Sequence, residues 1–228
     1  MNLVFTLDSA AGHQSLKADI QQLVIAGWAG RNRHAIEHHI EELAAIGVPR
    51  PSAVPLYYRV AANQLTQDEQ VQVVGPDSSG EAEVFVFTVD GEMYLSLASD
   101  HTDRKLESHS VALSKQLCVK PVARTAWRFA DVAGHWDELQ LRSRIVENGS
   151  DVLYQDGTLA SLRTPGDLIK GYTDGGPALA AGTAMLCGTV AVIGGIRPAT
   201  VFEMELSDPR SGRTIRHRYT QTLLPIVA

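Results

Sequence analysis

The feature that most constrains the fold is a long succession of strand-like segments after Pro49, separated by turn clusters. The segments are rich in β-branched and aromatic residues, and clusters such as "GPDSSG", "VDGE" and "ENGSD" lie between them. Such runs predict β-strands joined by turns. The expected strands are "AVPLYYRVAA", "EQVQVVG", "AEVFVFTV", "MYLSLAS", "WDELQLRSRIVE", "DVLYQDGT", "TAMLCGTVAV" and "ATVFEMELSD".

Residues 1–50 differ from the rest because they hold the main helical pattern. Short strands are expected at "LVFTL" and "LVIAGWAG", and a helix at "RNRHAIEHHIEELAAIG", whose apolar residues form one stripe. Asn32 can cap the start of this helix, and Gly47 followed by Pro49 ends it. We therefore expect an α+β chain, mostly β, with a helical N-terminal portion (1–50) and a β-rich portion (51–228).

Composition limits the kinds of partner that the protein is expected to bind and the cellular compartment expected for it. A net charge of −6 excludes nucleic acid as the main partner, because binding to phosphates requires a basic stripe. No apolar run is long and uninterrupted enough to predict a membrane span, and "MNLVFTLDS" is typical of a first strand rather than a signal peptide. Cys118 and Cys187 are expected to be buried free thiols. Together these features predict a cytoplasmic protein.

Two glutamates at the start of one expected strand need an explanation. Side chains alternate along a strand, so Glu81 and Glu83 share a face with Phe85 and Phe87. Two carboxylates about 7 Å apart on a partly buried face repel each other and resist desolvation. A compensating positive charge is therefore expected beside them.

A third acid can join this pair. If the "VDG" turn folds "AEVFVFTV" against "MYLSLASDH", Asp100 lies on the strand next to Glu81 and Glu83. Three oxygen donors without cysteine or histidine suit a hard cation, Mg²⁺ or Mn²⁺. The residues alone equally allow a rim of solvated acids at the strand ends.

The expected helix offers a pair of residues for acid–base chemistry. His39 and Glu42 fall beside its apolar stripe, and residues three apart on a helix can form a hydrogen bond. A carboxylate on an imidazole raises its basicity and fixes its tautomer, which a water-activating base requires. The helix lacks the zincin pattern. A solvated face is predicted for the opposite side, with His34, Glu37, His38 and Glu41.

Six segments, in order between about residues 25 and 205, resemble the fumarylacetoacetate hydrolase family, in a divergent branch. "AGRNRHAIEHHIEEL" resembles that family's "GRN" turn and lid helix, which carries a His-x-x-Glu dyad. "GEAEVFVF" resembles its Glu-x-Glu metal strand, and "SDHTDR" is similar to the segment with the third metal carboxylate and an arginine. "PSAVPLYYRV", "LSKQLCVKP" and "MLCGTVAV" are similar to its substrate-contacting segments.

The resemblance implies a mixed β-roll with a small N-terminal lid portion, assembled as a homodimer. It implies Mg²⁺ or Mn²⁺ held by Glu81, Glu83 and Asp100, and a lid dyad of His39 and Glu42. The helix has about one extra turn before the dyad, which leaves His38 with Glu41 as the alternative register. The residues implied to contact substrate are Tyr57, Tyr58, Arg59, Arg104, Lys115 and Thr189.

The function implied is a metal-dependent hydrolase of a C–C bond in a 2-oxo acid or a related 1,3-dioxygenated small molecule. In it His39 would activate a water while Lys115 and Arg59 hold the anionic substrate. The same site without attack by water gives a lyase: a decarboxylase, hydratase or dehydratase. A non-catalytic small-molecule binder is the second alternative. The chain departs from the family pattern at Cys118, where the family has aspartate, and at Val190, where it has proline.

Overall fold

Strands dominate the regular structure of the protein, which confirms the prediction of an α+β chain that is mostly β. The computed structural model describes residues 1–9, 12–45 and 50–227, except for the side chains at positions 39, 42 and 43. In chain order the strands are β1 (Asn2–Ser9), β2 (Gly12–Asp19), β3 (Gln22–Gly27), β4 (Leu56–Val60), β5 (Leu65–Thr66), β6 (Gln70–Val74), β7 (Ser78–Ser79), β8 (Ala82–Val89), β9 (Glu92–Ser99), β10 (Thr102–Asp103), β11 (Lys120–Pro121), β12 (Thr125–Arg128), β13 (Gln140–Glu147), β14 (Ser150–Thr158), β15 (Thr183–Leu186), β16 (Val201–Ser207) and β17 (Thr214–Leu224).

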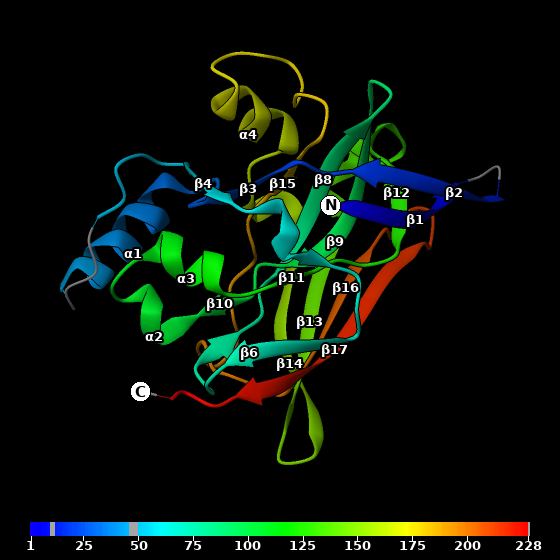
Figure 1. Cartoon of the computed structure of the whole chain (residues 1–228). Helices are drawn as coiled ribbons and strands as arrows, with labels where there is room; N and C mark the ends of the chain where they lie inside the picture. Colours follow the sequence, from blue (N-terminus) through cyan, green and yellow to red (C-terminus); the bar gives the residue numbers. More distant parts are fainter. Residues whose placement is uncertain (10–11, 46–49, 228) are drawn as a thin grey trace.

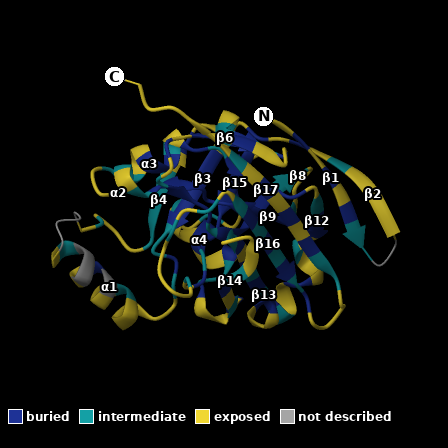
Figure 2. Ribbon diagram, turned by 90° about the horizontal axis from the view of Figure 1, so that it is seen from below, coloured by how far each residue is buried: buried dark blue, intermediate teal, exposed yellow. Residues whose placement is uncertain are grey.

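The helices are short, and α1, α2 and α3 gather on one side of the molecule (Figure 1). In Figure 2, α1 extends from this side with much of its surface exposed. The helices are α1 (Arg33–Ala45), α2 (Arg104–Glu107), α3 (Val111–Leu117) and α4 (Pro165–Tyr172), with 3-10 turns η1 (Ala62–Gln64), η2 (Phe129–Asp131), η3 (Ala133–Glu138) and η4 (Leu159–Ser161). None of the helices in the described ranges is long and apolar enough to cross a membrane.

Two large mixed sheets form the body of the molecule. One has the strand order β2-β1-β12-β9-β8-β15-β3-β4, and the other has the order β14-β13-β16-β17-β6. Parallel pairing joins β1 to β12, β3 to β15 and β6 to β17, and the remaining neighbours in these two sheets are antiparallel. Two short ladders, β7 with β10 and β5 with β11, complete the strand pairing among the described residues.

One hydrophobic core lies between the two sheets. Val84 and Leu97 from the eight-stranded sheet share it with Leu141, Met204 and Ile215 from the five-stranded sheet. Burying one such side chain fully stabilises the fold by about 1.5–3 kcal/mol. The contact between the sheets is therefore a main source of stability.

The eight-stranded sheet also curls around a second core. Phe5 on β1 and Phe87 on β8 stack with ring centroids 4.7 Å apart, although two strands separate β1 from β8 in the sheet. In a flat sheet three steps of about 4.8 Å would place these strands about 14 Å apart. Strand β8 is consequently covered on both faces, which explains its almost continuous apolar sequence.

A tight hairpin joins β8 to β9 at the predicted "VDG" turn. Asp90 and Gly91 both have positive φ, 51° and 82°, as a two-residue type I′ turn requires. Val89 then pairs with Glu92, and the register at the other end of the hairpin pairs Ala82 with Ser99. This register brings the segments that flank the two strands together.

Helix α1 begins as predicted. The Ala35 amide donates to Asn32 Oδ1 at 3.1 Å, which confirms the N-cap, and Ile40 is buried. The predicted solvated face is exposed at His34, Glu37, His38 and Glu41. The expected end of the helix at Gly47 and Pro49 lies outside the described residues.

Seven of the strands in the described residues were not predicted: the longer β2, β12 and β17, and the two-residue strands β5, β7, β10 and β11. The expected strand "TAMLCGTVAV" is correct only over β15, because the chain turns at Gly188, where φ is 86°. A side chain disfavours that left-handed conformation, so glycine ends the strand there. The turn directs the residues after it toward the start of β8.

Candidate functional site

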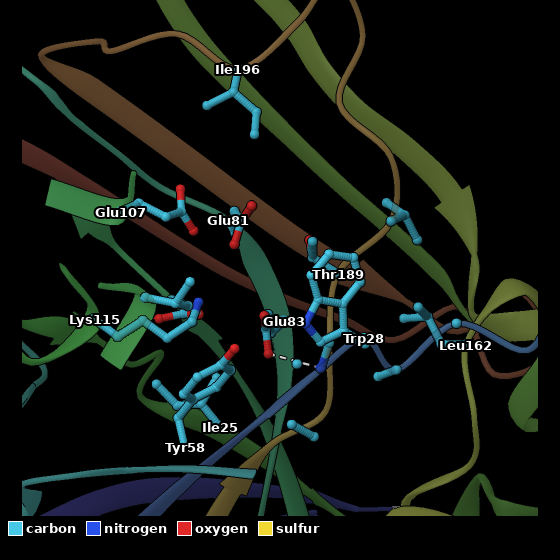
Figure 3. A pocket seen from close by; sticks show the side chains of 18 of the residues that line it. Ile25, Trp28, Tyr58, Glu81, Glu83, Glu107, Lys115, Leu162, Thr189 and Ile196 are labelled. Carbon is cyan, nitrogen blue, oxygen red and sulfur yellow. Dashed lines mark hydrogen bonds and ion pairs between the residues drawn. The ribbon is translucent and has the colours of Figure 1, made fainter. Parts of the chain in front are cut away.

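A cavity of about 610 Å³ lies where the end of β3, the start of β8, helices α2 and α3, and the segment after β15 meet (Figure 3). Its wall contains the three predicted metal carboxylates and the side chains of Arg104 and Lys115. Apolar residues of the β3–α1 connection and of the segment after β15 form much of the remainder. The volume falls in the range of about 300–1,000 Å³ that is typical of small-molecule sites.

The three carboxylates converge as predicted. Glu81 immediately precedes β8, Glu83 lies within it, and Asp100 immediately follows β9. The Asp100 amide donates to the Glu81 carbonyl at 2.9 Å, which fixes the two strand ends. One carboxylate oxygen from each residue lies within 4.8 Å of the other two. Glu83 and Asp100 are only 3% and 0% exposed, so the alternative of a solvated acidic rim is wrong.

Asp100 is held between two lysines. Lys115 Nζ contacts Asp100 Oδ2, and Lys120 Nζ lies 3.2 Å from Asp100 Oδ1 and also donates to the His101 carbonyl. Burial raises the pKa of Asp100, but the two ammonium groups together lower it to about 2. Burial likewise opposes the charge on Lys115, yet Asp100 and the neighbouring glutamates raise the pKa of this lysine above its ordinary value. Asp100 is therefore an anion throughout the physiological pH range.

Glu83 has the opposite electrostatic environment. Burial and the charges of Asp100 and Glu81 raise its pKa well above the ordinary value, against the opposing effect of Lys115. Its Oε2 accepts a hydrogen bond from the Gly188 amide at 2.8 Å. Without an added cation, Glu83 therefore holds a proton more readily than Asp100.

Arg104 balances the charge of Glu81. Its guanidinium lies 3.2 Å from Glu81 Oε1 and 3.0 Å from Glu107 Oε2, and its Nε donates to Ser79 Oγ at 2.7 Å. The expectation that a metal alone compensates the acids is therefore incomplete. Cations of the chain itself, Arg104 together with Lys115 and Lys120, provide much of the compensation.

The donor set fits a hard divalent cation. Ligand oxygens of one Mg²⁺ ion lie about 2.9 Å apart when adjacent and about 4.2 Å apart when opposite, so the cluster, now within 4.8 Å, contracts on binding an ion. Three carboxylates with no nitrogen or sulfur donor among them match Mg²⁺ or Mn²⁺.

The residues predicted to contact substrate divide into two groups. Tyr58 and Thr189 line the cavity together with Arg104 and Lys115. Thr189 Oγ1 donates to the Ala82 carbonyl at 2.7 Å, so it also supports the start of β8.

Tyr57 and Arg59 lie outside the cavity lining. They flank Tyr58 on β4, and alternation along the strand directs them to the other face. Tyr57 OH donates to the Leu168 carbonyl at 2.9 Å, and Arg59 donates to Tyr172 OH at 3.2 Å. Both side chains thus contact α4, and the structure does not bring them to the carboxylates.

The structure describes the backbone of the predicted His-Glu dyad but not its side chains. His39 and Glu42 belong to α1, as expected, but their side chains lie outside the described part of the structure. The choice between this pair and His38 with Glu41 stays a prediction.

Sequence reasoning missed several residues that build the site. Lys120 is fully buried, although lysine is rarely buried, and the short strand β11 gave no pattern from which its position could be deduced. Gln155 donates to Thr189 Oγ1 and accepts from the Ala82 amide, and no local signal pointed to it.

Trp28 is the third missed residue, and its backbone is unusual. It follows β3, lines the cavity and has a φ of 59°. A bulky residue in this left-handed region is a conformational outlier that costs about 1–3 kcal/mol and persists only where the surroundings fix it. Strain of this kind gathers at functional sites, which places Trp28 among the residues of interest.

Comparisons of fold identify structures with the same architecture. A fumarylacetoacetate hydrolase family protein from Yersinia pestis CO92 is 19% identical with a TM-score of 0.65, covering 94% of this chain and 100% of that one. A protein described as a fumarylpyruvate hydrolase from Burkholderia cenocepacia is 17% identical with a TM-score of 0.61, covering 98% and 96%. A 2-keto-3-deoxyarabinonate dehydratase is 14% identical with a TM-score of 0.64, covering 90% and 75%.

At these identities the likeness shows the fold alone. No curated protein matches the sequence. The model of one family, described as "Protein of unknown function (DUF2848)", matches residues 26–219. The chain therefore belongs to this family of unknown function, a divergent one with the fold of the fumarylacetoacetate hydrolases.

Proposed function

We propose that the protein is a divalent-metal-dependent enzyme that hydrolyses a C–C bond in a 2-oxo acid or a related 1,3-dioxygenated compound. The observation that carries this proposal is the convergence of Glu81, Glu83 and Asp100 in the wall of a cavity large enough for a small molecule. A fold shared with hydrolases supports it.

The three carboxylates would hold Mg²⁺ or Mn²⁺, which supplies a Lewis acid for an oxo oxygen and for the negative charge that develops next to it. The chain's own groups prepare the site for this. The Gly188 amide orients Glu83, and Lys115 and Lys120 keep Asp100 charged. Asp100 is therefore already deprotonated before a metal ion binds, as a metal ligand must be.

The cations in the cavity wall favour an anionic substrate. Lys115 Nζ lies 5.7 Å from the centre of the Tyr58 ring, and Arg104 borders the cavity beside Glu81. With a divalent ion added, the three acids, Glu107 and the three chain cations have a combined charge of +1. An anionic 2-oxo acid balances this charge.

The proposed base is His39, oriented by Glu42 on α1, which removes a proton from the attacking water. Closure of α1 over the cavity would deliver the imidazole and exclude bulk water. Replacing His39 with Ala should lower turnover at least about 100-fold and leave metal affinity unchanged.

Two variants of the same helix test the register of the dyad. His34→Ala serves as the matched control, since His34 is exposed on the opposite face. His38→Ala tests the alternative pair. A loss of turnover in His38→Ala with none in His39→Ala would move the assignment to His38 and Glu41. Full activity in both variants would reject a base on α1.

A lyase is the second candidate function, because the shared fold also includes a dehydratase. The two reactions differ in where solvent oxygen goes. Hydrolysis of a C–C bond in ¹⁸O-labelled water places ¹⁸O in a new carboxylate, whereas decarboxylation releases CO₂ and dehydration releases water.

The decisive screen uses 2-oxo acids and acylpyruvates with Mg²⁺ or Mn²⁺, and identifies products by mass. Activity should vanish with EDTA and in Glu83→Gln, and return with added metal only in the wild type. Full turnover in EDTA would contradict the proposal. Metal-dependent binding without turnover of any compound would favour the second alternative, a non-catalytic binder.

The proposal includes a homodimer. Exposed apolar side chains near the C-terminus support an interface, among them Leu223, Leu224 and Ile226 on and after β17. Light scattering should give twice the mass of one chain, and a monomeric mass at micromolar concentration would remove this part of the proposal.

A further inference from the structure

The cavity has two chemically different sides. Figure 3 shows Glu107 and Lys115 on one side and Trp28 and Leu162 on the other, with Glu81 and Glu83 between them. Ile196 lies at a further edge, above Glu81 in the view of Figure 3. The apolar lining of the cavity away from the lysine and arginine comprises Trp28, Ala29, Leu162, Val190, Ala191 and Ile196.

The positive charges are all on the carboxylate side. Arg104 and Lys115 are the cationic residues among the described residues that line the cavity. Arg104 already pairs with Glu81 and Glu107, and Lys115 with Asp100. A second carboxylate at the far end of a substrate would therefore meet an apolar wall without a partner, and burying an unpaired charge is strongly unfavourable.

Trp28 lies in this wall next to a tightly packed backbone segment. Its φ is 59°, and the next residue, Ala29, is buried. A Cβ on Gly188 would approach the Ala29 Cβ to 2.6 Å, so the backbone segments lie in tight contact. The indole is thus attached to a rigid frame, as a flat apolar contact surface requires.

Ile196 adds apolar surface at the edge of the cavity, from an anchored loop. Although Ile196 is 52% exposed, the next residue, Arg197, donates to both carboxylate oxygens of Glu147, and its guanidinium lies 5.1 Å from the centre of the Tyr154 ring. Arg197 also donates to the Ile193 and Gly195 carbonyls at 2.9 Å. An exposed isoleucine fixed at the edge of a cavity gains from contact with an apolar ligand group.

We propose that the substrate is a monoanionic 2-oxo acid with an apolar, preferably aromatic, substituent, and that Trp28, Leu162 and Ile196 bind this substituent. The inference rests on the proposed function for the placement of the oxo acid group at the carboxylates. The apolar subsite adds a selectivity that Glu81, Glu83 and Asp100 do not provide. It disfavours substrates that carry a second carboxylate.

The test compares the binding of three stable 2-oxo acids by calorimetry, at saturating Mg²⁺, so that no turnover is needed. Phenylpyruvate and 2-oxohexanoate carry an apolar group, and 2-oxoglutarate carries a second carboxylate. The first two should bind at least about tenfold more tightly than 2-oxoglutarate, the gain expected from burying a few apolar carbons.

Substitutions in the apolar lining test whether it causes this preference for apolar ligands. Glycine tolerates positive φ, so Trp28→Gly removes the indole without straining the backbone. This variant should lose most of the preference for phenylpyruvate. Ile196→Ala should weaken phenylpyruvate binding several-fold and leave 2-oxoglutarate unchanged. Ile193→Ala is the matched control, because Ile193 is exposed on the same loop and does not line the cavity.

Tryptophan fluorescence gives an independent readout. Trp127 and Trp136 are buried in the core between the sheets, so quenching by phenylpyruvate should come from Trp28 and disappear in Trp28→Gly. If Trp28→Gly fails to fold, as circular dichroism would show, Ile196→Ala with its control still decides the matter.

The outcomes separate the two proposals. Equal or tighter binding of 2-oxoglutarate, dependent on Mg²⁺, overturns the apolar subsite while the metal site stands. Binding of phenylpyruvate that depends on Trp28 but not on Mg²⁺ supports the subsite and counts against the proposed function. No binding of any of the three acids rejects the apolar subsite together with the 2-oxo acid form of the proposed function.

Discussion

Neighbouring carboxylates in this cavity differ in how they hold a proton. Lys115 and Lys120 keep the pKa of Asp100 at about 2, against the effect of burial. Burial and the adjacent anions raise the pKa of Glu83. Because a metal ligand must be deprotonated, binding of a divalent cation would compete with a proton on Glu83, and we expect metal affinity to fall as the pH falls.

Lys120 should be the most costly lysine to remove. Lys120→Met leaves part of the charge of Asp100 unpaired in a fully buried position, although Lys115 remains. We expect the free energy of unfolding to decrease by about 3 kcal/mol, at the lower end of the range for a broken buried pair. Urea denaturation measures this, with Lys105→Met, at an exposed position, as the control. An equal effect of the two substitutions would contradict the assigned role.

His101 should make the fold sensitive to acid. Burial, with the charges of Lys120 and Arg104, lowers its pKa to about 3, whereas an unfolded histidine titrates near 6.5. Below about pH 6.5 the unfolded chain therefore binds a proton that the folded chain does not. The free energy of unfolding therefore decreases by up to about 1.4 kcal/mol per pH unit as the pH falls from about 6.5 toward 3.

His101→Gln tests this contribution, compared with His13→Gln at an exposed position. The difference in unfolding free energy between wild type and His101→Gln should shrink between pH 7 and pH 4. A pH profile of His101→Gln parallel to that of the wild type would show that His101 does not carry the effect.

At the scale of elements, the turns decide where the site residues lie. The β8–β9 hairpin could be predicted because "VDG" between two apolar runs fixes a two-residue turn and thereby the register. That register places Glu81 next to Asp100, so the convergence of the carboxylates could also be predicted. Local sequence alone left a metal site and a solvated rim of acids equally open, and the family resemblance favoured the metal site.

Strand β17 shows why other elements could not be predicted. Its inward residues are Ile215, His217 and Tyr219, alternating with Arg216 and Arg218. Two of the three buried side chains carry polar atoms, so the apolar period of two is weak in the sequence. Pairing with β16, the preceding strand, and with β6, which is far away in the chain, stabilises the strand instead. Lys120 escaped prediction for the same reason, since its partners come from other elements.

Gly188 is the turn residue on which the site depends most. Its φ of 86° disfavours a side chain, and an added Cβ would meet the Ala29 Cβ at 2.6 Å. Gly188→Ala should therefore lower the free energy of unfolding by about 1–3 kcal/mol. It should also weaken Mg²⁺ binding, because the amide that orients Glu83 is displaced.

Thermal denaturation and calorimetric Mg²⁺ titration measure these two effects. Gly149→Ala is the control for positive φ alone, since Gly149 has a φ of 78° and no atoms close to an added Cβ. Unchanged Mg²⁺ affinity in Gly188→Ala would show that the turn does not orient Glu83.

At the scale of the whole molecule, the five-stranded sheet supports the site carried by the eight-stranded one. Tyr219 OH from β17 lies 2.9 Å from Ser99 Oγ and 2.8 Å from His101 Nδ1, on both sides of Asp100. Gln155 from β14 bonds to the Ala82 amide between the two glutamates. The packing of the two sheets is thus coupled to the geometry of the carboxylates.

The central claim is that Glu81, Glu83 and Asp100 share one divalent cation. The most direct measurement is an anomalous difference map from a crystal equilibrated with millimolar MnCl₂. The account predicts one strong peak about 2.0–2.3 Å from an oxygen of each carboxylate, absent in Glu83→Gln. A map with no peak among the three residues, from a crystal that retains this fold, would contradict it.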